Sequence, residues 1–166
     1  LMTLQACVLM GAERIVVADV IERRLEKALQ LGAWHVINGR KEDTVDRSRA
    51  LFGGDGADIV FETAGSRVTA MQSFASVRRG GEVMIVGTIP GETPVDFLKI
   101  NREVKVQTVF RYANNFPMTI QAISSGRFDV LTMVTDEYTY EDVQKAFEES
   151  LSRKAEIIKG VIKIGD

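Results

Sequence analysis

Cysteine and histidine are nearly absent from this sequence, whose 166 residues include one of each, Cys7 and His35. A single cysteine cannot form an intrachain disulfide, and one cysteine with one histidine cannot supply the three or four nitrogen and sulfur ligands of a zinc site. A bound zinc ion would therefore need ligands from outside this sequence. We interpret Cys7 as a core residue on an apolar helix face and His35 as an ordinary half-buried side chain.

Long apolar runs and clusters of like charge are also lacking. The longest apolar stretch, LMTLQACVLMGA at residues 1–12, is too short to span a bilayer and follows no basic segment, which predicts neither a membrane helix nor a signal peptide. The 21 Lys and Arg residues nearly balance the 23 Asp and Glu residues, for a net charge of −2, which disfavours binding to nucleic acid or anionic lipid. With 45% hydrophobic residues and no internal repeat, the sequence predicts a globular cytoplasmic protein without nucleic-acid or membrane partners.

What the sequence does contain is a regular alternation of strand and helix patterns. Short apolar runs typical of buried parallel strands occur at residues 15–19, 34–38, 57–62, 82–87 and 105–110. Helical periodicity occurs at residues 1–11, 21–32, 43–52, from about residue 66, and at 117–125. Strands that alternate with helices form parallel sheets through right-handed crossovers. We therefore predict an α/β fold with a doubly wound parallel sheet covered on both faces.

The rhythm changes near residue 127. The segment GRFDVLTMVTDEYTY at residues 126–140 loses the buried-strand pattern, and the helix predicted over 141–152 is strongly amphipathic and acidic. Its apolar stripe needs a partner surface and consists of Val143, Ala146, Phe147 and Leu151. We place a domain boundary here, between a first domain of residues 1–127 and a second segment of residues 128–166.

Asp19 is the most informative single residue, because it ends the first predicted strand between two predicted helices. In a dinucleotide-binding fold, an acid at this point accepts hydrogen bonds from the adenosine ribose hydroxyls. A role in capping the next helix explains it equally well from the spacing alone. Val20 and Ile21 are apolar and offer nothing to a 2′-phosphate, although Arg23 and Arg24 are close, so the sequence favours NAD over NADP.

Two glycines, Gly65 in FETAGS and Gly87 in MIVGT, follow predicted strand ends. Their missing side chains would let a flat ligand approach the carboxyl edge of the sheet, and ordinary turn glycines explain them equally well. The G-x-G-x-x-G turn that precedes the first helix of a dinucleotide fold does not occur here, and neither does the strand before it. We therefore expect a Rossmann-like sheet that lacks its first strand and its glycine-rich turn.

Several strings of the sequence resemble one family, the zinc-dependent medium-chain alcohol dehydrogenases, and most closely its sorbitol and xylitol dehydrogenase branch. They are LMTLQACVLMGA, IVVAD, LEKALQLGA, DIVFETAGS, RRGGEVMIVG and VFRYANNFP. The last is the most specific, because polyol dehydrogenases carry a Val-Phe-Arg-Tyr run followed by Asn and Pro. The resemblance covers nearly the whole chain. It implies the C-terminal portion of such an enzyme, with an NAD-binding Rossmann domain at residues 1–127 and a returning segment of the catalytic domain at 128–166.

The resemblance also implies roles for individual residues. Eight would bind the cofactor, in three groups: Asp19 and Arg24 at the adenosine ribose, Val86, Gly87 and Thr88 beside the nicotinamide half, and Val109, Phe110 and Arg111 along the nicotinamide. Arg111 and Tyr112 would hydrogen-bond the hydroxyls of a polyol substrate, or the water network at the metal. Without the resemblance, we would interpret Arg111 as a member of a surface salt bridge and Tyr112 as an aromatic residue of the core. The family's catalytic zinc is held by a cysteine, a histidine and a glutamate of an N-terminal domain, so no catalytic or metal residue is expected in this chain.

The function implied by the resemblance is oxidation of the secondary alcohol of a polyol to a ketone with NAD and zinc, with this chain inactive alone. Because loss of the first strand exposes two inner sheet edges, we also expect a homo-oligomer. Two alternatives stay open from the sequence. One is a non-catalytic nucleotide-binding or assembly module that keeps the fold, and the other is an NADP-dependent reductase of the same superfamily.

Overall fold

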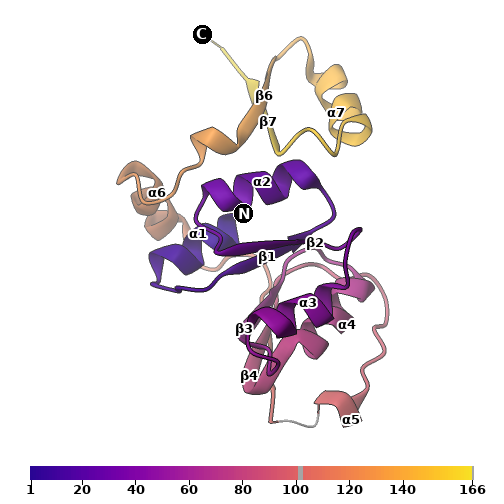
Figure 1. The fold of residues 1–166 in the computed structure, drawn as a ribbon. Helices are drawn as coiled ribbons and strands as arrows, with labels where there is room; N and C mark the ends of the chain where they lie inside the picture. The colour runs from indigo at the N-terminus through magenta and orange to yellow at the C-terminus, as the bar shows by residue number, and fades with distance from the viewer. Residues whose placement is uncertain (101–102, 166) are drawn as a thin grey trace. The chain divides into compact units, whose positions relative to one another are not determined.

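The computed structural model describes residues 1–100 and 103–165 (Figure 1). Its contacts divide the chain into two compact units. The first unit combines residues 1–36 with the chain from Asn114 onward, and the second unit is Ile37–Ala113. Each unit is described by itself.

The first part of the first unit contains helix α1 (Met2–Leu9), strand β1 (Val16–Asp19) and helix α2 (Glu22–Gln30). Strand β2 (His35–Asn38) forms a two-stranded sheet with β1 and crosses the boundary into the second unit. Helix α2 packs on β1 and buries Leu25 and Ala28, whose spacing of three places them on one helix face. The predicted glycine stop after α2 is confirmed, because Gly32 has a positive φ of 97°, where glycine is favoured.

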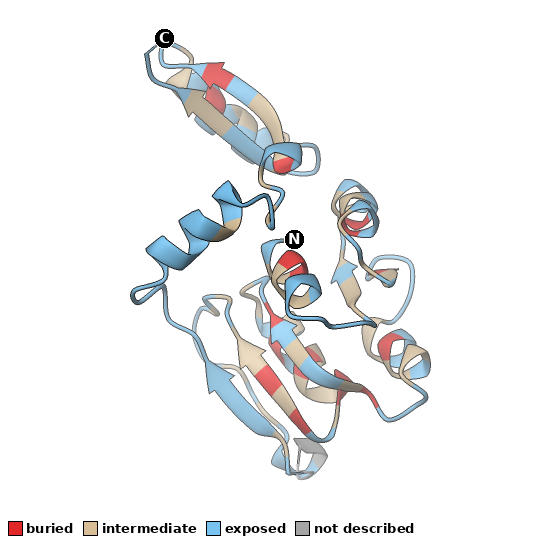
Figure 2. Cartoon of the chain, turned by 90° about the vertical axis from the view of Figure 1, so that its left-hand side faces the viewer, coloured by how far each residue is buried: buried red, intermediate tan, exposed pale blue. Residues whose placement is uncertain are grey.

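The rest of the first unit contains helix α6 (Phe116–Ser124), the short 3₁₀ helix η1 (Leu131–Met133), strand β6 (Val134–Thr139), helix α7 (Val143–Ser152) and strand β7 (Lys159–Lys163). Strands β6 and β7 are parallel, and α7 connects them and packs on both. Of the apolar stripe predicted for α7, Ala146 is buried, whereas Phe147 and Leu151 are exposed. Helix α6 has no buried residue and is pale blue over most of its length (Figure 2).

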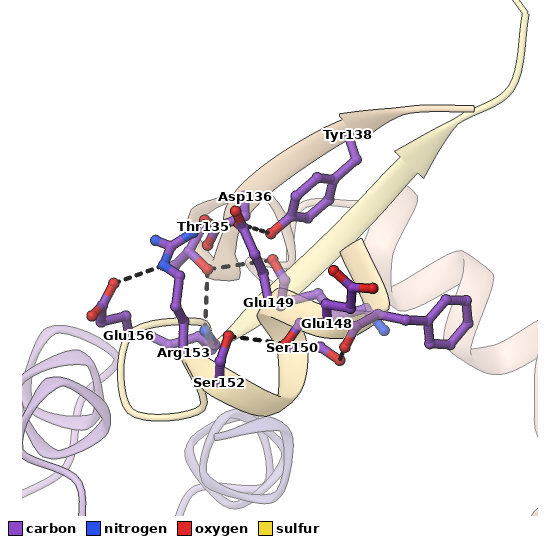
Figure 3. A network of polar contacts seen from close by, with 12 residues as sticks. Thr135, Asp136, Tyr138, Glu148, Glu149, Ser150, Ser152, Arg153 and Glu156 are labelled. Atoms are coloured by element: carbon purple, nitrogen blue, oxygen red, sulfur yellow. Dashed lines mark hydrogen bonds and ion pairs between the residues drawn. The ribbon is translucent and has the colours of Figure 1, made fainter. Parts of the chain in front are cut away.

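A network of polar contacts joins β6, α7 and the turn before β7 (Figure 3). The Arg153 guanidinium lies 2.7 Å from a carboxylate oxygen of Glu149, 3.2 Å from Asp136 and 2.9 Å from Glu156. The Tyr138 hydroxyl donates a hydrogen bond of 2.9 Å to Glu149. These bonds raise the pKa of Arg153 and lower the pKa of Glu149, in which the bond from Tyr138 is the largest cause. One arginine thereby pairs with three acids, from β6, α7 and the turn before β7.

The second unit is built on a three-stranded parallel sheet with the order β3-β4-β5. Its elements are α3 (Thr44–Leu51), β3 (Ala57–Glu62), α4 (Arg67–Ser76), β4 (Val77–Ile85), α5 (Phe97–Ile100) and β5 (Lys105–Thr108). In the pairing register, Val83 lies opposite Val60 on one side and Val106 on the other. Helix α4 packs on β3, β4 and α3, and the buried residues of this unit include Ala70, Val77 and Val83. Asp43 caps α3 and Ser66 caps α4, each by accepting a backbone N–H bond three residues ahead.

The parallel α/β arrangement predicted from the sequence is confirmed in both units. Strands β1 and β3 each stand at the end of their sheet. In the strand order 3-2-1-4-5-6 of a Rossmann fold, these are the two strands that flank the first one. Strand β4 begins at Val77, five residues earlier than predicted, and α5 and η1 were not predicted. The domain boundary near residue 127 stays a prediction.

Within residues 1–100 and 103–165, no helix is both long enough and apolar enough to cross a membrane.

Candidate functional site

Asp19 ends β1 and uses its two carboxylate oxygens differently. Oδ1 accepts hydrogen bonds from the backbone N–H groups of Val20 (2.7 Å) and Ile21 (3.0 Å), which shapes the turn into α2. Oδ2 lies 3.7 Å from the guanidinium of Arg24. The N-cap residue of α2 is Ile21, and no side chain caps this helix, so the alternative role of Asp19 as a helix cap is wrong. The Asp19 side chain is about one quarter exposed (26%).

The amino end of α1 belongs to the same site. The backbone nitrogen of Leu1 lies within electrostatic range of both Asp19 and Arg24. The start of α1 therefore lies near the carboxyl end of β1. The first N–H groups of a helix lack partners within the helix and favour a negatively charged ligand. The site thus combines the Asp19 carboxylate with the amino end of a helix.

Arg23 and Arg24 are both engaged within the first unit. Arg23 donates a hydrogen bond to the backbone carbonyl of Glu156, and Arg24 faces Asp19. Both guanidinium groups therefore have acceptors within this unit.

Val86, Gly87 and Thr88 follow β4 in the second unit, beside the loop that follows β3. The backbone N–H groups of Val86 and Gly87 both donate to the backbone carbonyl of Glu62, at 2.9 and 3.0 Å. A Cβ atom on Gly87 would lie 2.4 Å from the backbone nitrogen of Gly65, and one on Gly65 would lie 2.8 Å from the Thr88 carbonyl oxygen. Both glycines are therefore required by the contact of these two loops with each other, whatever ligand lies at the sheet edge.

Val109, Phe110, Arg111 and Tyr112 follow β5. The backbone N–H of Val109 donates to Ile85 (2.8 Å), which extends the pairing of β4 and β5 by one residue. Arg111 has a φ of 55°, and its guanidinium lies 5.3 Å from the centre of the Phe110 ring in a cation–π arrangement. Phe110 is 83% exposed and Tyr112 is 63% exposed, so Tyr112 is not a core aromatic. The structure thus presents two large aromatic side chains and a cation on a surface rather than in a core.

The predicted site residues fall into two groups, one in each unit. Asp19 and Arg24 lie in the first unit, and the residues from Val86 to Tyr112 lie in the second. No group of three or more His, Cys, Asp or Glu side chains within the described ranges could hold a metal ion. Burial raises the pKa of the Cys7 thiol, which keeps it protonated at neutral pH.

Sequence reasoning missed two buried polar residues with specific partners, one in each unit. Glu62 is the last residue of β3 and is buried between the two loops of the second unit. Gln5 of α1 is 7% exposed and makes two hydrogen bonds with the backbone of Asp129. The signal available in the sequence was a polar residue inside an otherwise apolar pattern, which indicates a buried group with specific partners.

Comparison with known proteins adds to this geometry. The family model for zinc-binding dehydrogenases matches residues 1–125. The sequence is 64% identical, over all of its 166 residues, to 48% of the uncharacterised zinc-type alcohol dehydrogenase-like protein YdjJ of Escherichia coli strain K12. It is 37% identical over 98% of its length to 46% of a sorbitol dehydrogenase of Bacillus subtilis.

A solved structure from Escherichia coli, that of ECK1772, an oxidoreductase/dehydrogenase of unknown specificity, is also similar. It superposes with a TM-score of 0.94 at 63% identity over 99% of this chain and 47% of the other. The predicted Rossmann-like fold is thereby confirmed. The chain spans about half the length of the curated relatives it matches.

Proposed function

Because this chain belongs to the zinc-binding dehydrogenase family, we propose that it is the cofactor-binding portion of an enzyme that oxidises the secondary alcohol of a polyol to a ketone with NAD. We call the full-length dehydrogenase that contains this chain the parent enzyme. In it, NAD would supply the hydride acceptor when bound, and residues of this chain would bind and orient it. The chain alone does not catalyse the reaction.

The observation that carries the proposal is the arrangement at Asp19. Oδ1 is occupied by two backbone N–H groups and fixes the carboxylate, while Oδ2 faces Arg24 and is available to accept a ribose hydroxyl. The nearby amino end of α1 suits the pyrophosphate of the same ligand. A 2′-phosphate would place negative charge against the Asp19 carboxylate, which favours NAD over NADP.

The second group of residues supports the nicotinamide half of the proposal. Val86, Gly87 and Thr88 would lie beside the nicotinamide half of NAD, and Val109, Phe110 and Arg111 would line the ring. Arg111 and Tyr112 would hydrogen-bond the hydroxyl groups of the polyol, since a guanidinium and a phenol are directional donors. The exposure of the Phe110 and Tyr112 side chains fits residues that meet a ligand or another part of the parent enzyme.

The zinc ion of the family does not fit the described part of this chain. No group of His, Cys, Asp and Glu side chains of the required size occurs there, and Cys7 and His35 are the only residues of their kinds. The ligands would therefore lie elsewhere in the parent enzyme, and no step through zinc is assigned to residues of this chain.

We further propose that the parent enzyme is cytoplasmic with no nucleic-acid or membrane partner, and that this chain by itself forms a homo-oligomer. The near-balanced charge and the single cysteine support the first part. Strands β1 and β3, which stand at the ends of their sheets, support the second part, because bare sheet edges favour pairing with another copy. Light scattering of this chain tests the assembly, and a stable monomer at working concentration would contradict it.

The test of the proposed function is cofactor selectivity in the parent enzyme. Asp19→Ala should raise the KM for NAD about tenfold or more and improve the preference for NADP, since it removes one charged hydrogen bond and one repulsion. Glu26→Ala removes an exposed carboxylate from the same helix region and serves as the matched control. An unchanged NAD to NADP ratio in Asp19→Ala would contradict the assignment. Binding of NAD without turnover of any polyol would favour the alternative of a non-catalytic binding module.

A further inference from the structure

Glu62 is the one charged residue among the buried side chains of the described part of the chain, with 2% of its surface exposed. It stands at the carboxyl end of β3, in the middle of a contact between two loops. Burying a carboxylate is costly unless its oxygens are well paired. Glu62 is therefore expected to have a specific structural role at this position, and its hydrogen bonds indicate what that role is.

The side chain of Glu62 holds the loop that follows β3. Its Oε1 atom accepts three hydrogen bonds: from the backbone N–H groups of Ala64 (3.0 Å) and Gly65 (2.9 Å), and from the hydroxyl of Thr69 (2.6 Å). The Thr69 hydroxyl in turn lies 2.7 Å from that of Ser66, the N-cap of α4. One carboxylate oxygen thus fixes the whole turn between β3 and α4.

The backbone of Glu62 holds the loop that follows β4. Its carbonyl oxygen accepts the N–H groups of Val86 and Gly87. Its second carboxylate oxygen, Oε2, is buried without a hydrogen-bond partner in the described ranges, and a Cβ atom on Gly87 would lie 2.5 Å from it. Gly87 therefore packs directly against the carboxylate. Glu62 therefore fixes the loop after β3 with its side chain and contacts the loop after β4 with both its backbone carbonyl and its carboxylate.

We propose that Glu62 is a positioning residue for the cofactor. It acts through Gly65 and Gly87, and it sets the conformation in which Val86, Gly87 and Thr88 meet the nicotinamide half. This inference rests on the proposed function. Glu62 itself is buried and does not touch the cofactor, so its effect is on how tightly and in which orientation the cofactor binds.

Three substitutions separate the acceptor role of Glu62 from its charge. Glu62→Ala removes the acceptor and leaves the two backbone N–H groups and the Thr69 hydroxyl without it. Glu62→Gln keeps an amide oxygen that can take the place of Oε1, removes the charge, and puts an NH2 group in place of Oε2. Thr69→Val is nearly isosteric and removes one of the three donors, whereas Thr69→Ser keeps the hydroxyl. Val83→Ala, in the buried centre of β4, lowers stability without touching either loop.

The experiment measures the NAD dissociation constant and the thermal unfolding of the parent enzyme for each variant. Glu62→Ala should raise the dissociation constant about tenfold, because three buried donors lose their acceptor. Thr69→Val should raise it about threefold, because it removes one of these donors. Glu62→Gln and Thr69→Ser should recover most of the lost affinity. Val83→Ala should lower the unfolding temperature and leave the dissociation constant near that of the wild type.

The outcomes distinguish the two proposals. If the wild-type parent enzyme binds neither NAD nor NADP, the proposed function fails. If the wild type binds NAD and Glu62→Ala binds it as tightly as the wild type does, the positioning role alone is overturned. The same follows if Glu62→Ala and Val83→Ala lower the unfolding temperature equally and their NAD dissociation constants are also equal. If Glu62→Ala does not fold, the comparison of Thr69→Val with Thr69→Ser decides, and equal affinities in that pair overturn the role.

Discussion

Gln5 provides the sharpest structural prediction, because its amide pairs with the backbone of one residue in both directions. Its Nε2 donates to the carbonyl oxygen of Asp129 (2.9 Å), and its Oε1 accepts the Asp129 N–H (2.6 Å). This pair ties α1 to the segment in front of η1, 124 residues along the chain. Gln5→Met keeps the length of the side chain and removes both hydrogen bonds.

The expected cost follows from the two backbone groups that lose their partners. An unpaired buried polar group costs about 1 to 3 kcal/mol, and the Asp129 groups are only partly buried, so we expect about 2 to 4 kcal/mol in total. That is a large share of the roughly 5 to 15 kcal/mol that stabilises a domain. The Asp129 amide should exchange its hydrogen at least about thirtyfold faster, since about 2 kcal/mol corresponds to that factor.

The assay is hydrogen–deuterium exchange of the parent enzyme, followed in peptides that cover residues 127–133. Gln5→Glu is the matched control, because a carboxylate still accepts the Asp129 N–H but cannot donate to the Asp129 carbonyl. We expect exchange of the Asp129 amide in Gln5→Glu to lie between the wild type and Gln5→Met. Equal exchange in the wild type and Gln5→Met would refute the pairing.

Three further predictions concern other sites. In the parent enzyme, Arg111→Ala should lower kcat/KM for a polyol roughly tenfold to a hundredfold, and Tyr112→Phe should lower it less. Steady-state kinetics measures both effects, and wild-type kcat/KM values in both variants with every polyol tested would exclude a role in substrate binding. The lowered pKa of Glu149 means that its bond from Tyr138 stabilises the fold above the ordinary glutamate pKa of 4.5 and that this stability is lost as the pH falls below it. Thermal unfolding should therefore become less pH-dependent in Glu149→Gln, and an unchanged dependence would contradict this. Cys7 should react slowly with a thiol reagent at pH 8 and rapidly after denaturation, because burial raises its pKa; equal rates would show an accessible thiolate.

The fold was largely predictable because apolar periodicity reports burial directly. The strand ADIVFE was predicted at its observed bounds, Ala57–Glu62, and the glycine stop after α2 matched the positive φ of Gly32. The early start of β4 was not predictable, since RRGG at residues 78–81 has no strand propensity. Val77 pairs with Ala57 and the next paired residue of β4 is Glu82, so the register is irregular across this stretch. Local patterns cannot report a conformation that tertiary contacts impose.

The position of Asp19 was predictable, whereas the arrangement around Glu62 was not. Asp19 ends a short apolar strand before a helix, which is a local signal, and coordinates were needed to exclude the helix-cap alternative; its role at the ribose stays a prediction. Glu62 acts through loops that follow two different strands, and no local pattern reports which backbone N–H groups a buried carboxylate will meet. The roles of Arg111 and Tyr112 come from the resemblance and stay predictions.

The most direct measurement of the central claim is a crystal structure of the parent enzyme with NAD bound. The account predicts that a hydroxyl of the adenosine ribose lies within hydrogen-bond distance of Asp19 Oδ2, about 2.5 to 3.0 Å, with the pyrophosphate at the amino end of α1. An adenosine ribose bound away from Asp19, or a 2′-phosphate accommodated between Arg23 and Arg24, would contradict it.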